Sequence, residues 1–173
     1  RRFRATCEQA PLGIAHVDLA GCWLRVNPAF QDIVGYQRDE LAARTVEQLT
    51  HDEDRAEDAA LMRQLLDGEI KNYNLEKRLW HKDGHPVWVH ASVSSVSDAQ
   101  GRPKYLVVIL NDVTQRRLAA DQMAKFSSAI DQAADSIMIA GNDGIIEYVN
   151  PAFEVLTGYS ADAAPGCAAR HLR

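Results

Sequence analysis

The sequence predicts an α+β fold, in which a five-stranded antiparallel sheet carries several short helices on one face and a linker helix follows. Three observations lead to this fold class. After a short leading helix, two short strand patterns are followed by helical patterns, and three long strands close the domain. The spacing of apolar residues changes from a helical period to a period of two at about residue 73. The opening part of the domain also returns further along the chain.

This repeat defines the expected domains. The segment NPAFQDIVGY at residues 27–36 returns as NPAFEVLTGY at residues 150–159, an offset of 150 − 27 = 123 residues. Residues ahead of the segment repeat at the same offset: Phe3, Gln9, Ala10, Ile14, Gly21 and Val26 recur as Phe126, Gln132, Ala133, Ile137, Gly144 and Val149. A long match at one fixed offset indicates a duplicated domain. We expect a complete domain at residues 1–113, a helical linker at 114–125 and a truncated second copy at 126–173.

The first half of the domain has the patterns of two short strands and several helices. The strands are IAHV and CWLRV, on either side of the turn DLAG. Asn27 is a good N-cap and Pro28 suits the first helical position, so NPAFQDIV begins a helix that Gly35 ends. Further helical segments are expected at residues 2–10, 39–43, 46–49 and 52–66.

The second half alternates between apolar and polar residues, which is typical of strands. The first strand covers residues 73–80, and the loops KDGH and DAQGRP turn the chain into strands at 87–96 and 105–113. Helical spacing resumes at Thr114. The apolar positions Ala119, Met123, Phe126, Ile130 and Ala133 are spaced like a short, weak coiled-coil seam.

Composition excludes some classes of function. The formal net charge of −5 gives no electrostatic footprint for nucleic acid. The sequence contains no run of 18 apolar residues, so we expect no membrane segment. The three cysteines lack CxxC spacing, which fits a reducing, cytoplasmic setting.

Four motifs in this order, NPAF…GY, HDEDR, LEKRLWHKDGHPVWV and NDVT, make the sequence resemble the PAS family of sensor domains. The resemblance extends from Phe3 to about Thr114 and again from Phe126 to the end. It implies a five-stranded sheet around a small internal cavity. It also implies a bacterial signalling protein in which such domains regulate a kinase, a diguanylate cyclase or a phosphodiesterase. An ion pair between Glu40 and Lys82 is implied as well.

The resemblance disfavours flavin. Flavin-binding members carry an asparagine–cysteine pair where this sequence has Thr45 and Val46. Their amide side chains on the long strands match Leu79, Val89 and Leu110 here. A flavin ring would lose its polar partners, at about 1–3 kcal/mol for each unsatisfied group.

Haem is also disfavoured. Haem-binding members place an axial histidine on the long helix, near the position of Glu57, and residues 52–67 contain no histidine. We expect none of His81, His85 and His90 to pair with a cysteine or carboxylate at ligand spacing, so no metal site is predicted.

The internal cavity should be lined by one face of the sheet and by helical residues. The predicted lining is Phe30, Met62, Leu66, Leu75, Leu79, Val89, Ala91, Val93, Leu106, Val108 and Leu110. Because this lining is almost wholly apolar, two alternatives stay open: a packed core without ligand, or a small apolar or weakly polar metabolite.

The opposite sheet face carries an apolar patch: Trp80, Trp88, Tyr105, Val107 and Ile109. With the hairpin loop centred on Gly84, Trp80 would lie opposite Trp88. Such a patch should not face water. We expect the leading helix to cover it with Phe3 and Cys7, together with a second subunit in a homodimer.

The predicted function is a sensory and dimerisation module without a catalytic constellation of its own. Asp112 ends the last strand, and Gln115 follows at the spacing of a capping box. We expect Asp112 and Thr114 to pass changes in the sheet to the linker helix and to a covalently linked output domain. The alternatives are a ligand-free structural relay and a flavin or haem sensor of redox state or gas.

Overall fold

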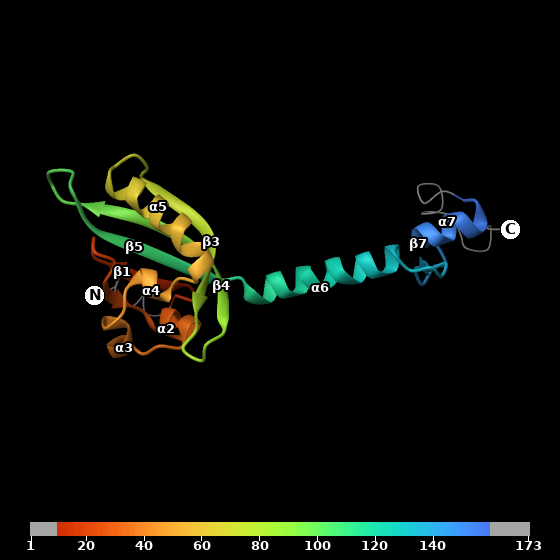
Figure 1. Ribbon diagram of the computed structural model, residues 1–173, viewed down its shortest axis with the longest axis horizontal. Helices are drawn as coiled ribbons and strands as arrows, with labels where there is room; N and C mark the ends of the chain where they lie inside the picture. Colours follow the sequence, from red (N-terminus) through yellow and green to blue (C-terminus); the bar gives the residue numbers. More distant parts are fainter. Residues whose placement is uncertain (1–9, 160–173) are drawn as a thin grey trace. The chain divides into compact units, whose positions relative to one another are not determined.

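The computed structural model of the protein describes residues 10–159 (Figure 1). The predicted order of two strands, several helices and three strands is present. The elements are β1 (Gly13–Val17), β2 (Trp23–Val26), α2 (Pro28–Val34), α3 (Arg38–Ala42), α4 (Val46–Leu49), the 3₁₀ turn η1 (Asp52–Asp54), α5 (Arg55–Leu66), β3 (Asn72–Trp80), β4 (Pro86–Ser97) and β5 (Pro103–Asp112). The α+β fold class is therefore confirmed.

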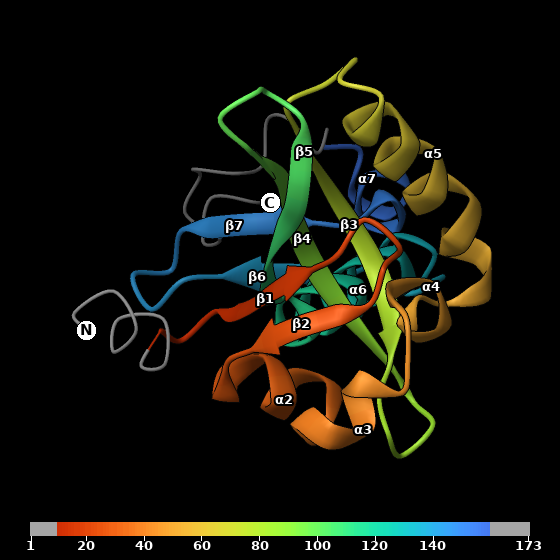
Figure 2. The same cartoon turned by 90° about the vertical axis from the view of Figure 1, so that its left-hand side faces the viewer.

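The strands form one antiparallel, five-stranded sheet in the order β2-β1-β5-β4-β3. The last strand of the domain, β5, lies in the centre, because β1 pairs with it on one side and β4 on the other. Helices α2 and α3 lie beside β1 and β2, and α5 lies beside β3 (Figure 2). The helices and one face of the sheet enclose the core.

Alternation along the long strands has the predicted register. Ala91 of β4 pairs with Leu75 on β3 and with Leu110 on β5, and it is fully buried. A slip of one residue would have turned this face outward. The neighbouring inward residues are also buried: Leu79, Val89, Val93, Leu106 and Val108.

The pairing across the β3–β4 hairpin differs from the expectation. Trp80 pairs with Pro86 and Arg78 pairs with Trp88, so Trp80 does not lie opposite Trp88. The reason is that the His81 N–H donates to the His85 carbonyl at 2.9 Å, which centres the turn on Asp83 rather than on Gly84. Both tryptophans still share the outer face.

Asn27 joins the first strand to the first helix of the core. Its Oδ1 accepts the backbone N–H groups of Ile14 at 2.8 Å and Phe30 at 2.9 Å. Its Nδ2 donates to the Leu12 carbonyl at 2.9 Å. The side chain therefore caps α2 and fixes the start of β1 at the same time.

The second copy begins with the same structure. Its elements are β6 (Met138–Ala140), β7 (Ile146–Val149) and α7 (Pro151–Thr157). Met138 pairs with Val149 as Ala15 pairs with Val26, so the register is conserved at the offset of 123 residues. Asn150 accepts the N–H groups of Ile137 and Phe153, as Asn27 does for its own neighbours.

Helix α6 (Thr114–Asp131) contains the boundary between two compact units, which falls between Arg117 and Leu118. Among residues 10–159, none of the helices combines the length and the apolar character needed to cross a lipid bilayer.

We predict that Asn27→Ala lowers the free energy of unfolding by about 2–4 kcal/mol, because it removes a helix cap and leaves buried backbone groups without partners. Urea denaturation followed by tryptophan fluorescence measures this change. The matched control is Asn111→Ala, at an exposed asparagine of β5, with an expected effect below about 0.5 kcal/mol. Equal effects of the two substitutions would contradict the bracing role of Asn27.

Candidate functional site

The predicted cavity lining is largely a packed core. Most of its members are buried, whereas Met62, Leu66 and Leu75 are partly buried at its border. Phe30 packs against Trp23, with ring centroids 4.9 Å apart. Whether any of these residues contacts a ligand stays a prediction.

A pocket of about 310 Å³ lies between α4, α5 and the turn that joins β1 to β2. Of the predicted lining, Met62 and Leu66 border this pocket and the other nine residues do not. Thr45 and Val46, at the positions that match the flavin-linked pair, border it as well. Its polar edge is formed by Thr50, Arg55, Asp58 and other residues of α4 and α5.

Next to the pocket, a buried polar cluster connects α5 to β3. Lys77 Nζ donates to Asp58 Oδ2 at 2.5 Å and to the Thr50 hydroxyl at 3.3 Å. The Tyr73 hydroxyl donates to Asp58 Oδ1 at 3.1 Å. Lys77 and Asp58 are 3% and 4% exposed, respectively. A charge buried to this degree requires partners, and here both carboxylate oxygens are engaged.

Burial determines the protonation behaviour of this cluster. Burial lowers the pKa of Lys77, and the charge of Asp58 opposes that effect. Burial also raises the pKa of Tyr73, and the Asp58 carboxylate raises it further. Tyr73 therefore keeps its proton and continues to donate to Asp58.

The alternation of β3 places Lys77 on the inward face, but sequence reasoning missed its partners. Asp58 precedes the apolar residues Leu61, Met62 and Leu65 by three, four and seven positions, which places it on the buried side of α5. Tyr73, Leu75 and Lys77 follow one another at every second position, on the inward side of β3. A carboxylate and a lysine on facing apolar surfaces were the signal for a buried pair.

The outer face of the sheet is partly covered by residues of the same unit. The Arg117 guanidinium lies 3.9 Å from the centroid of the Trp88 ring, and Arg78 lies 5.1 Å from it. Trp80 stacks on His51, with centroids 4.6 Å apart. Phe3 and Cys7, the expected cover, lie outside the described residues.

The part of this face on β5 is more open. Tyr105 packs against His16, with centroids 5.3 Å apart, and Val107 is partly buried. Ile109 is 37% exposed. An apolar surface therefore remains at the centre of the sheet, where β5 lies.

The start of α6 is hydrogen-bonded to β4. The Trp88 N–H donates to Thr114 Oγ1 at 3.0 Å, and this hydroxyl donates to the Trp88 carbonyl at 3.3 Å. The Val113 N–H also donates to the Trp88 carbonyl, at 2.9 Å. Asp112 Oδ1 accepts the Thr114 N–H at 2.8 Å, so Asp112 braces the junction itself. The expected pairing with Gln115 has no counterpart among the described hydrogen bonds.

An ion pair adds a second connection at this junction. Arg117, in the first turn of α6, contacts Glu76 of β3 at 2.9 Å, while its guanidinium covers Trp88. Glu76 and Lys77 are neighbours on β3 that face opposite sides of the sheet. One strand thus contacts α5 on the inner side and α6 on the outer side.

The implied ion pair between Glu40 and Lys82 is present, with Nζ and Oε1 2.6 Å apart. The hydrogen bond from Lys82 lowers the pKa of Glu40.

The expectation about histidines needs correction. His81, Asp83 and His85 place one potential ligand atom each within 4.8 Å of the others, because the tight turn brings them together.

Family comparisons match both copies. The family model described as "PAS fold" matches residues 1–113, and the one described as "PAS domain" matches residues 124–172. The "Probable diguanylate cyclase DgcE" of Escherichia coli (strain K12) is 32% identical over 84% of this chain and 13% of its own length. The "Sensor histidine kinase TmoS" of Ectopseudomonas mendocina is 30% identical over 78% of this chain and 14% of its own. The chain thus spans a small part of these relatives.

Solved structures have the same fold. The PAS domain of a protein from Colwellia psychrerythraea superposes with a TM-score of 0.62 at 19% identity, covering 66% of this chain and 97% of that one. A domain of the "sensory box sensor histidine kinase/response regulator" from Geobacter sulfurreducens gives a TM-score of 0.55 at 28% identity, covering 64% of this chain and 91% of that one.

We predict that Lys77→Met lowers the free energy of unfolding by about 3–5 kcal/mol, because it leaves the Asp58 carboxylate buried without its cation. Urea denaturation is again the measurement. Adding Asp58→Leu should restore most of the loss, since an apolar pair can replace a buried ion pair. The control is Lys71→Met, at an exposed lysine. If the double variant is no more stable than the single one, the loss does not come from the unpaired charge.

Proposed function

This chain belongs to the PAS family, and we propose that it is the sensory and dimerisation module of a longer bacterial signalling protein. In this proposal a change at the pocket or at the outer face of the sheet is passed to α6. The observation that carries the proposal is the attachment of Thr114 to both backbone groups of Trp88.

The hydrogen-bonding pattern supports a relay of this kind. Trp88 lies on β4, and its carbonyl receives bonds from both Val113 and Thr114. A shift of β4 therefore displaces two consecutive residues at the end of the sheet. Coupling energies of about 1–3 kcal/mol are typical of such switches, and a few hydrogen bonds are sufficient to supply them.

The input that we propose is a small, weakly polar metabolite in the 310 Å³ pocket. Thr50 and Asp58 would provide its polar contacts, and Met62 and Leu66 the apolar wall. Because Asp58 is bonded to Lys77, a ligand there would act directly on β3. The alternative is a ligand-free relay. Native mass spectrometry distinguishes the two, because only the sensor would carry a mass that denaturation removes.

The proposed output is a kinase, a diguanylate cyclase or a phosphodiesterase in the same polypeptide. The relatives support this class of output, because they are named as a diguanylate cyclase and a histidine kinase. Catalysis would take place in that domain, and the module would work in the cytoplasm. Flavin or haem as the sensing group stays the less favoured alternative, and visible absorbance of the purified protein tests it.

Dimerisation is proposed on the exposed part of the outer face, around Ile109 and Tyr105. Apolar residues at the centre of a sheet are suited to the core of an interface between subunits. Helix α6 offers a second apolar surface, because Met123 and Phe126 of the expected seam are 73% and 65% exposed in the single chain.

We predict that Ile109→Glu raises the dissociation constant of the homodimer by about tenfold or more, because it places a charge in the interface; each tenfold is about 1.4 kcal/mol. Sedimentation velocity over a concentration series measures it. The control is Leu24→Glu, at an exposed leucine beside α3. If the Ile109→Glu protein dimerises as strongly as the control, this face of the sheet does not form the dimer interface.

We predict that Asp112→Ala leaves the domain folded but separates the parent protein's output from its input, because the junction with α6 loses the hydrogen bond from Thr114 to Asp112, worth about 0.5–1.5 kcal/mol. Inserting seven residues after Arg117 should preserve regulation, since two turns keep the helix in phase. Inserting three or four residues should disturb it. Output activity of the full-length protein is the measurement, and equal regulation in all variants would reduce α6 to a passive tether.

A further inference from the structure

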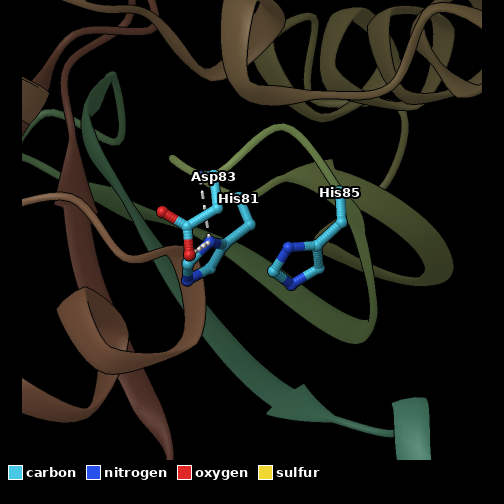
Figure 3. Close-up of side chains that lie close together, drawn as sticks. All are labelled: His81, Asp83 and His85. Atoms are coloured by element: carbon cyan, nitrogen blue, oxygen red, sulfur yellow. Dashed lines mark hydrogen bonds and ion pairs between the residues drawn. The ribbon is translucent and has the colours of Figure 1, made fainter.

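The turn between β3 and β4 brings together three side chains that can ligate a metal ion. Figure 3 shows the Asp83 carboxylate next to the His81 ring, with the His85 ring alongside. One ligand atom of each residue lies within 4.8 Å of the other two. The two imidazole rings stack with centroids 4.4 Å apart. Two nitrogens and one carboxylate oxygen therefore converge at one end of the domain.

Gly35 fixes the direction of the His81 ring. A side chain at Gly35 could not be accommodated, because its Cβ would lie 2.3 Å from His81 Nε2. Gly35 also has a φ of 73°, which suits its place at the end of α2. With Nε2 against this backbone, His81 Nδ1 is directed toward the turn. It accepts the Asp83 N–H at 3.2 Å and lies 3.4 Å from Asp83 Oδ2.

The backbone holds this arrangement in place. The His81 N–H donates to the His85 carbonyl and the Gly84 N–H to the His81 carbonyl, both at 2.9 Å. Lys82 donates its N–H to the Val34 carbonyl at 3.0 Å, and its ammonium group pairs with Glu40. The nearest cation in sequence is therefore neutralised by a partner outside the cluster.

From this geometry we propose that His81, Asp83 and His85 bind a divalent transition-metal ion, of which zinc is the best match, with the remaining coordination position open to solvent. Neutral imidazole nitrogens favour zinc, nickel and copper, whereas magnesium and calcium prefer sites composed wholly of oxygen. Zinc binds imidazole and carboxylate at about 2.0–2.2 Å. The ligand atoms must therefore approach one another by about an ångström. Asp83 and His85 are exposed and free to make this movement.

The position of the site favours reversible occupation. The carboxylate side chain of Asp83 is 75% exposed, so an ion reaches the cluster without opening the core. Occupation would replace the weak bond between His81 Nδ1 and the Asp83 N–H. None of the bonds that hold the hairpin together would be lost.

Isothermal titration calorimetry with zinc chloride tests the proposal on the full chain. Cys7, Cys22 and Cys167 are first replaced by serine, so that thiolates do not compete for the metal. We expect one zinc ion per chain. The affinity for zinc should fall by about tenfold or more in each of His81→Gln, Asp83→Asn and His85→Gln. Loss of a residue that only hydrogen-bonds to a metal ligand already lowers metal affinity by about 10–100-fold. Magnesium chloride should give no binding.

The matched control is His90→Gln, at a partly buried histidine on β4 outside the cluster, which should bind zinc like the parent protein. In NMR spectra, zinc should shift the ring signals of His81 and His85 and leave those of His90 in place. The proposal is overturned if the parent protein does not bind zinc, or if the Asp83→Asn and His85→Gln proteins bind it as tightly as the control.

Discussion

The bonding between Thr114 and Trp88 connects the sheet to α6, and the proposed relay depends on this connection. The Thr114 hydroxyl and the N–H of the preceding residue, Val113, attach the start of α6 to the backbone of Trp88 on β4. An apolar side chain at this position would leave the Trp88 N–H without this acceptor. The junction is short, because β5 ends at Asp112 and α6 begins at Thr114.

Three consecutive residues of β3 connect this junction to the interior. Lys77 points inward to Asp58 of α5, whereas Glu76 and Arg78 point outward. Glu76 pairs with Arg117 of α6, and Arg78 pairs with Asp54 while its guanidinium lies over Trp88. A displacement of α5 can therefore reach α6 through the backbone of a single strand. The Lys77–Asp58 pair is the buried part of this connection, and its low-dielectric surroundings strengthen the interaction and penalise its loss.

Much of this arrangement could be predicted from the sequence, and the exceptions have physical reasons. The repeat offset of 123 residues predicted a second copy, and Met138 pairs with Val149 as Ala15 pairs with Val26. In both copies an asparagine, Asn27 or Asn150, accepts the N–H groups of the first strand and of the helix. Alternation predicted the buried face of Ala91. The partners of Lys77 were missed because Asp58 resembles a surface residue of a charged helix. The histidine cluster was missed because a five-residue turn, not a recognised ligand spacing, brings His81 and His85 together.

The most direct test of the account is hydrogen–deuterium exchange, resolved by residue, in the wild-type protein and in Thr114→Val. The variant keeps the shape of the side chain but lacks its hydroxyl. If the junction joins sheet and helix as described, the amides of Trp88 and of the first turn of α6 should lose protection together. Protection in β1 and β2 should stay unchanged. Loss of protection in α6 alone, with the Trp88 amide still protected, would contradict the claim that Thr114 connects the sheet to the helix.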